Sequence, residues 1–90
     1  MGEAPREATD EEVREVLSHL PRSSEVPSPE EVQVSALCRE DGAAWFWVYP
    51  IRVAVGDIYL TWVLERTPSG EWSVGSFRSR RTARGDVTVP

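Results

Sequence analysis

The side chains that could perform acid–base, nucleophilic or metal chemistry are few and scattered in this chain of 90 residues. His19 is the only histidine and Cys38 the only cysteine, so together they cannot supply a zinc ligand set. Asp57 and Glu65 are a candidate carboxylate pair, but a turn explains Asp57 and an exposed strand face explains Glu65. We therefore expect no catalytic site, no metal site and no cofactor, and we predict that the protein is not an enzyme.

Charge is distributed unevenly along the sequence. The formal net charge is −5, and residues 1–41 hold 11 acids against 4 bases, whereas residues 42–90 hold 4 acids against 6 bases. An acidic total makes nucleic acid an unlikely partner, because neutralisation of phosphates drives that binding. All ten basic residues are arginine, and lysine and asparagine are absent, which indicates a GC-rich genome.

The basic residues of the second half gather near the C-terminus, where we predict an Arg-rich tail over residues 79–90. The basic residues assigned to this tail, together with the arginine just before it, are Arg78, Arg80, Arg81 and Arg84. The tail could be solvated, could steer a partner, or could contact nucleic acid as a weaker alternative.

No apolar stretch approaches the roughly 20 residues of a membrane helix, and no signal core precedes residue 10. We therefore expect a cytoplasmic protein without membrane contact.

One helix is predicted over residues 10–20, after a disordered lead-in at residues 1–8. Thr9 and Glu12 have the spacing of a capping box, in which each side chain satisfies the backbone N–H of the other residue. An apolar stripe follows at helical spacing and must pack on another element, because so short a helix is unstable alone in water. Three prolines in residues 21–29 predict a linker without regular structure.

Four strands are predicted at residues 31–39, 44–55, 58–66 and 71–78, from alternating apolar positions and the turn residues between them. Asp41 and Gly42 predict a two-residue hairpin turn, as do Gly56 and Asp57, while residues 68–70 predict a three-residue loop. The expected fold is a single α+β domain, with the N-terminal helix packed on a curved four-stranded antiparallel meander. Pro50 predicts a bend in the long second strand.

These turns assign the side chains of the sheet to two faces. The face toward the helix holds large aromatic residues, which form either ordinary core or a small-molecule pocket between helix and sheet: Trp45, Trp47, Tyr49 and Trp62. The opposite face is more apolar than an exposed sheet face usually is, and we predict that it binds a protein partner or a second copy. Its contact residues are Leu37, Phe46, Val48, Val63 and Phe77.

Residues 58–77 form a strand, a glycine-containing loop, a tryptophan and a closing aromatic residue. This stretch resembles the terminal hairpin of domains similar to nuclear transport factor 2 and steroid isomerases. The length of the whole chain better fits a cystatin-like fold, in which a meander wraps around one helix. The resemblance implies an α+β fold, and none of those families' functional residues matches a position in this chain.

The sequence thus favours a small interaction protein, such as a regulator, an inhibitor or an accessory subunit, which acts through a semi-apolar sheet face. A small-molecule-binding domain that uses the aromatic pocket is the alternative.

Overall fold

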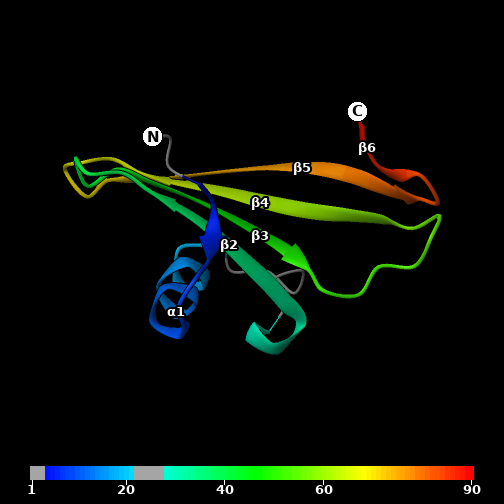
Figure 1. The fold of residues 1–90 in the computed structure, drawn as a ribbon, viewed down its shortest axis with the longest axis horizontal. Coiled ribbons are helices and arrows are strands. Elements are labelled where there is room, and N and C mark those ends of the chain that lie inside the picture. The colour runs from blue at the N-terminus through cyan, green and yellow to red at the C-terminus, as the bar shows by residue number, and fades with distance from the viewer. Residues whose placement is uncertain (1–3, 22–27) are drawn as a thin grey trace.

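The computed structural model describes residues 4–21 and 28–90, and an antiparallel sheet is its main element (Figure 1). The strands lie in chain order, so each pairs with its neighbours in the sequence. A short α-helix, α1 (Asp10–Ser18), and a 3₁₀ turn, η1 (Pro29–Glu31), lie on one side of the sheet. The strands are β1 (Arg6–Glu7), β2 (Val32–Cys38), β3 (Ala44–Pro50), β4 (Ile58–Arg66), β5 (Trp72–Thr82) and β6 (Gly85–Val89).

The prediction of a four-stranded sheet is wrong, because the sheet has six strands. One extra strand, β1, lies within the predicted disordered lead-in, where Arg6 and Glu7 pair with Ala36 and Ser35. The backbone N–H of Ala8 then donates to the carbonyl of Val34 at 2.9 Å. A two-residue strand is too short to show alternation, so the sequence gives no periodic signal for it.

The second extra strand replaces the predicted tail over residues 79–90. β5 continues through Thr82, and a tight turn at Ala83 and Arg84 leads into β6. Gly85 follows this turn with φ +125°, a backbone conformation that residues with a side chain rarely adopt. The C-terminal arginines therefore lie on a β-hairpin.

The capping box at the start of α1 is confirmed. The Thr9 hydroxyl accepts from the Glu12 N–H at 3.2 Å, and the Glu12 carboxylate accepts from the Thr9 N–H at 2.9 Å. The helix ends at Ser18, two residues earlier than predicted, and His19 caps it. The His19 ring stacks on Trp72 with 4.2 Å between ring centroids, which ties the end of α1 to the start of β5.

An ion pair joins β1 to α1. The two terminal guanidinium nitrogens of Arg6, Nη1 and Nη2, donate to the Glu12 carboxylate at 2.8 and 2.9 Å. These hydrogen bonds from Arg6, together with those from Thr9, lower the pKa of Glu12 to about 2. The same carboxylate therefore caps the helix and holds β1 beside it.

The first hairpin has a three-residue loop, and the predicted two-residue turn at Asp41 and Gly42 is wrong. The Arg39 N–H donates to the Ala43 carbonyl at 2.8 Å, so these two residues pair across the loop. Gly42 adopts φ +94°, the left-handed position that closes a loop of this kind. Cys38 consequently pairs with Ala44, one residue earlier than predicted.

The second connection is a long loop at residues 51–57, although a two-residue turn at Gly56 and Asp57 was predicted. β3 ends at Pro50, which has no N–H to donate, and the N–H of Ile51 donates to Glu31 instead. Val48 pairs with Trp62 in the resulting register. The last hairpin has the predicted register, since Leu64 pairs with Val74.

Together the two errors of register invert β3 and leave the other predicted strands on their expected faces. Each error shifts the pairing by an odd number of residues, and an odd shift exchanges the faces of a strand. β3 therefore packs Phe46 and Val48 under α1, while Trp45 and Trp47 face the other way. The core consists of Val16, Leu20, Val32, Val34, Ala36, Ala44, Phe46, Val48 and Leu64.

Two further expectations concern the N-terminal half and the membrane. Most of the predicted linker, residues 22–27, lies outside the described residues, and Pro29 belongs to η1. None of the helices within residues 4–21 and 28–90 has the length and apolar character needed to cross a membrane.

The corrected register predicts that two phenylalanines differ in how much they contribute to the free energy of unfolding. Phe46 is 1% exposed and Phe77 is 40% exposed. We expect Phe46→Ala to lower the free energy of unfolding by about 3–5 kcal/mol, because it leaves a cavity in the core. Phe77→Ala should cost less than about 1 kcal/mol, as is usual at the surface. Urea denaturation of both variants measures the difference, and equal losses would contradict the register.

The Arg6–Glu12 pair predicts a loss of stability in acid. Because the pKa of Glu12 is lowered to about 2 in the folded protein, its contribution is complete above the unfolded pKa of about 4.3. It declines as the pH falls from there through the folded pKa. Urea denaturation between pH 6 and pH 2 should show this decline, and Glu12→Gln should reduce it. A variant with an unchanged pH profile would show that Glu12 does not contribute in this way.

Candidate functional site: an aromatic trough on the open face

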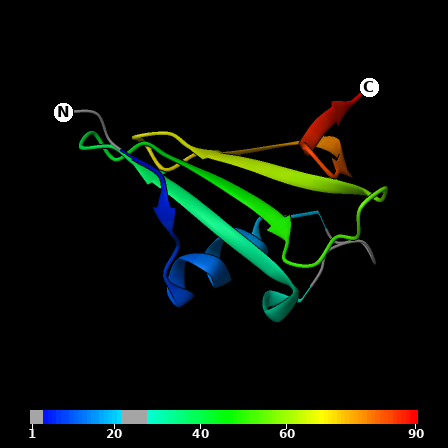
Figure 2. The ribbon, with the colours of Figure 1, turned by 45° about the vertical axis from the view of Figure 1, so that its right-hand side comes forward.

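The side of the sheet opposite α1, here called the open face, has no helix on it among the described residues (Figures 1 and 2). Cross-strand partners share a face, so the register fixes its composition. Most of its side chains are aromatic, aliphatic or hydroxyl-bearing. They include Ser35, Leu37, Trp45, Trp47, Tyr49, Tyr59, Thr61, Val63, Phe77, Ser79 and Arg81.

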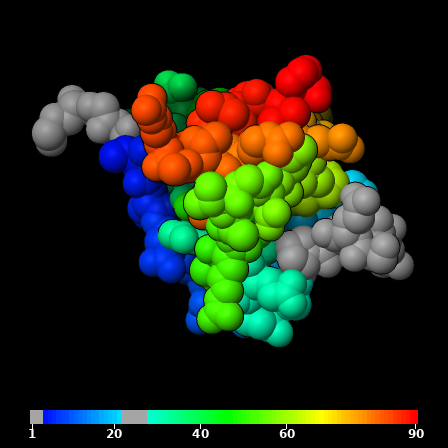
Figure 3. All heavy atoms as spheres, turned by 90° about the vertical axis from the view of Figure 1, so that its right-hand side faces the viewer, coloured from blue at the N-terminus to red at the C-terminus, as the bar shows by residue number. Residues whose placement is uncertain are grey.

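This face contains a hollow of about 440 Å³, here called the trough. Its lining reaches from Pro5, beside β1 at one edge of the sheet, to Asp86 on β6 at the other edge. The hollow therefore crosses the open face from one edge of the sheet to the other. Figure 3 shows β5 and β6 (orange and red) at the end of the molecule opposite η1 (cyan). The lining is Pro5, Ser35, Trp47, Tyr49, Tyr59, Thr61, Phe77, Arg81 and Asp86.

Aromatic rings from three adjacent strands form the body of the trough. Trp47 and Tyr49 come from β3, Tyr59 from β4, and Phe77 from β5. The Tyr49 hydroxyl lies 3.1 Å from the Ser35 hydroxyl, so a hydrogen bond holds this ring against β2. Rings supported in this way offer apolar area at a low cost in conformational entropy.

Hydroxyl groups lie between and beneath these rings. Thr61 and Ser79 are each only 5% exposed, although both are polar. No buried side-chain nitrogen or oxygen of the described residues lacks a hydrogen-bond partner. The floor of the trough is therefore internally satisfied and does not depend on a ligand for its polar groups.

A charged group closes one end of the trough. Arg81 donates to Asp86 at 3.1 Å, and the Tyr59 hydroxyl donates to the same carboxylate. The bond from Tyr59, followed by those from Arg81, lowers the pKa of Asp86. The bond to Asp86 raises the pKa of Tyr59, because ionised Tyr59 would lose this bond and would face a second negative charge.

These shifts make Tyr59 and Asp86 poor partners for proton transfer near neutral pH. General acid–base catalysis works best with a pKa near the working pH. Here the carboxylate is held in its charged form and the phenol in its neutral form. The trough thus offers flat apolar surface, hydroxyl groups and one compensated ion pair, which are the properties of a binding site.

The predicted contact residues divide between the two faces. Leu37, Val63 and Phe77 lie on the open face, as the sequence indicated. Phe46 and Val48 do not, since both are buried under α1, and a charged residue at Phe46 would disrupt the core. The inversion of β3 explains this correction.

The predicted pocket between helix and sheet is not formed by its predicted residues. Trp45, Trp47 and Tyr49 lie on the open face, whereas Trp62 packs against the core on the helix side. Trp47 and Tyr49 do line a hollow, but Tyr59 and Phe77 complete it.

The four C-terminal arginines do not form one basic patch. Arg81 lies on the open face with Asp86, while Arg78 and Arg80 point to the opposite face, and Arg84 is in the turn. One guanidinium nitrogen of Arg80 donates to the Gly56 carbonyl at 2.9 Å. The basic-tail interpretation therefore loses its geometric basis.

The remaining reactive side chains are also separate. Asp57 precedes β4 and Glu65 lies near its end, about 26 Å away along an extended strand, so they form no carboxylate pair. Cys38 is half-buried on the helix side, where Arg6 donates to its sulfur at 3.5 Å. His19 is occupied by its stacking on Trp72.

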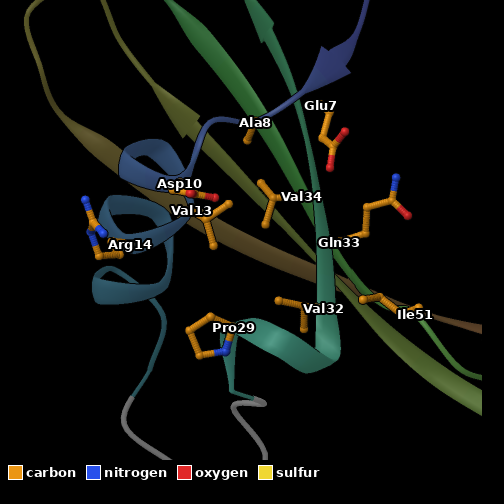
Figure 4. A pocket seen from close by; sticks show the side chains of 10 residues that line it. All are labelled: Glu7, Ala8, Asp10, Val13, Arg14, Pro29, Val32, Gln33, Val34 and Ile51. Atoms are coloured by element: carbon orange, nitrogen blue, oxygen red, sulfur yellow. The ribbon is translucent and has the colours of Figure 1, made fainter.

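A second hollow of about 570 Å³ lies beside α1 (Figure 4). Small aliphatic side chains from α1 and β2 line it, including Val13, Val32 and Val34, and Glu7, Asp10 and Arg14 bring charges of both signs. Its lining includes no aromatic residue. The trough is therefore the stronger candidate site.

Comparison of the chain with protein-family models, curated proteins and solved structures found no match. The site must accordingly be interpreted from its own geometry.

The ion pair at the end of the trough predicts a specific tyrosine titration. In Asp86→Asn, the pKa of Tyr59 should fall toward the ordinary value of about 10, because the neighbouring negative charge is gone. Absorbance near 295 nm, followed with pH, reports phenol ionisation, and Tyr59→Phe identifies the contribution of this residue. Identical titrations of wild type and Asp86→Asn would show that Asp86 does not raise the pKa of Tyr59.

Proposed function

We propose that this protein is a small non-enzymatic interaction protein whose open face binds a protein partner. It would act as a regulator, an inhibitor or an accessory subunit. The observation that carries the proposal is the trough, a concave aromatic surface that no helix of the described chain covers.

The composition of the open face supports a protein partner. The centres of protein interfaces are depleted in charge and enriched in tyrosine, tryptophan and phenylalanine. The trough presents Trp47, Tyr49, Tyr59 and Phe77, and its two charged residues neutralise each other. Tryptophan and tyrosine are also the residues that most often carry binding energy in such interfaces.

The extent of this surface also favours a macromolecule over a small ligand. The lining reaches from one edge of the sheet to the other, and the trough is open to solvent along its length. Small-molecule sites usually enclose most of their ligand. A protein interface instead needs about 800 Å² on each partner, which a six-stranded sheet face can supply.

Nucleic acid is a poorer match to this surface. Aromatic rings on a sheet can stack with bases, but such faces also need basic residues for the phosphates. In the trough the one arginine is paired with Asp86, and the whole chain carries a net charge of −5.

The test compares the open face with another exposed surface. Tagged wild type, a Trp47→Ala/Phe77→Ala variant and a Val55→Ser/Val87→Ser control are used to capture partners from the native source. Val55 and Val87 are apolar and more exposed than Phe77, and neither of them lines the trough. Their replacement therefore removes exposed apolar surface outside the trough. The captured protein is then purified and titrated against each variant.

We expect the control to bind as wild type does, whereas each trough aromatic contributes about 2 kcal/mol or more. The Kd of the double variant should thus rise by at least about 30-fold, the factor that 2 kcal/mol corresponds to. Circular dichroism checks that all variants are folded. Binding that survives in the trough variant and fails in the control would refute the proposal. A Kd change seen only with a small molecule would instead favour the alternative function, a small-molecule-binding domain.

A further inference from the structure

β5 presents a long open edge. It has 11 residues, but β6 pairs only with its second part, from Arg78 to Thr82. Residues 72–77 pair with β4 on one side and with no described strand on the other. An open edge of this kind exposes backbone N–H and C=O groups that can pair with another strand.

The register shows which residues direct their backbone outward. Arg81 donates to the Asp57 carbonyl at 2.9 Å, and Thr67 donates to the Glu71 carbonyl at 2.8 Å. The odd-numbered residues of β5 thus direct their backbone toward β4, since the pairing between them is continuous. Because the direction alternates along a strand, Trp72, Val74 and Ser76 direct theirs toward the open edge.

This edge lacks the features that usually protect edge strands. Residues 72–77 contain no proline and no charged residue. Val74 is 38% exposed and Phe77 is 40% exposed. Natural edge strands usually carry charges, prolines or bulges, or are very short, so that they do not pair with another chain. At the other edge of the sheet, β1 is only two residues long and both are charged.

We propose that the open edge of β5 pairs with the same edge of a second copy, which forms an antiparallel two-fold dimer. A second copy presents the same unprotected segment, so one contact satisfies the outward backbone groups of both chains. Residues 72–77 carry no charged side chain, so two copies can meet along this segment without placing like charges opposite each other.

β6 limits the register of this dimer. Val89 already pairs with Arg78, so the strand of the second copy must end before Arg78. A two-fold axis at Val74 meets this condition, since it pairs residues 72–76 with residues 76–72 of the second copy. All the outward-directed residues then face one another, with Val74 opposite Val74 and Trp72 opposite Ser76.

The dimer joins the two sheets into one continuous sheet. Because cross-strand partners share a face, both open faces lie on the same side of it. The two troughs would then form parts of one surface, and a partner bound there could contact both copies.

The first measurement is the association state of the wild type, by sedimentation equilibrium and native mass spectrometry over a range of concentrations. A reversible dimer is expected, and Ser76→Pro should weaken it. Proline removes the outward N–H of Ser76, which is not used in pairing with β4. Each dimer then loses two hydrogen bonds, so its Kd should rise roughly 30-fold, while the matched control Ser76→Ala should leave it unchanged.

A charge exchange tests the register independently. Val74→Lys and Val74→Glu should each be monomeric, because like charges would lie directly opposite each other across the two-fold axis. Mixed together, the two variants should form a heterodimer with the mass of one copy of each. Circular dichroism and thermal unfolding confirm that the variants are folded.

Three results would overturn the proposal. The wild type could stay monomeric up to its limit of solubility, a dimer could form that Ser76→Pro leaves unchanged, or the mixed Val74 variants could fail to associate. A wild type that stays monomeric is also the result expected if the open edge pairs with a strand of a different protein, and it would equally refute the dimer. Partner capture through the trough is measured separately, so failure of the dimer does not remove the proposed function.

Discussion

The pairing of Arg39 with Ala43 decides how every residue of β3 is used. Side chains alternate along a strand, so the length of this one loop determines which set faces α1. With three residues in the loop, Phe46 and Val48 enter the core and the larger Trp45 and Trp47 remain on the open face. With two residues in it, the tryptophans would lie beneath a nine-residue helix.

This allocation gives the two faces different tasks. On the face toward α1, Phe46 is the largest fully buried side chain, and Trp62 and Trp72 pack partly buried against the core. The stacked rings of His19, Trp72 and Phe46 then link the end of the helix to the sheet. Stability resides mainly on that face, and the open face is left with aromatic residues that the fold does not need to bury.

Local signals in the sequence were enough for the elements that they describe. The capping box predicted the start of α1, and Pro68 with Gly70 predicted the last loop and its register. Asp41 and Gly42 were ambiguous, because the same pair can form a two-residue turn or close a three-residue loop. The hydrogen bond from Ala43 to the Asp41 side chain, at 2.9 Å, supports the second form but cannot be recognised from composition.

The candidate site was harder to predict than the fold for a related reason. Phe77 and Val63 were placed correctly because β4 and β5 kept their register, whereas Trp47 and Tyr49 followed β3 to the other face. Asp86 was missed because it belongs to a strand that follows an arginine-rich stretch, which resembles a solvated tail in sequence. Its pairing with Tyr59 and Arg81 depends on β6 folding back, a contact that no local pattern encodes.

The order of the strands has a consequence for how the chain folds. From β2 to β6 each strand pairs with the next one in the sequence, so this part of the sheet can grow one hairpin at a time with short loops to close. The contact between His19 and Trp72 is different, since it joins residues that are far apart in the chain. Because distant contacts are slow to form, docking of α1 on an already assembled sheet should be the step that limits the folding rate.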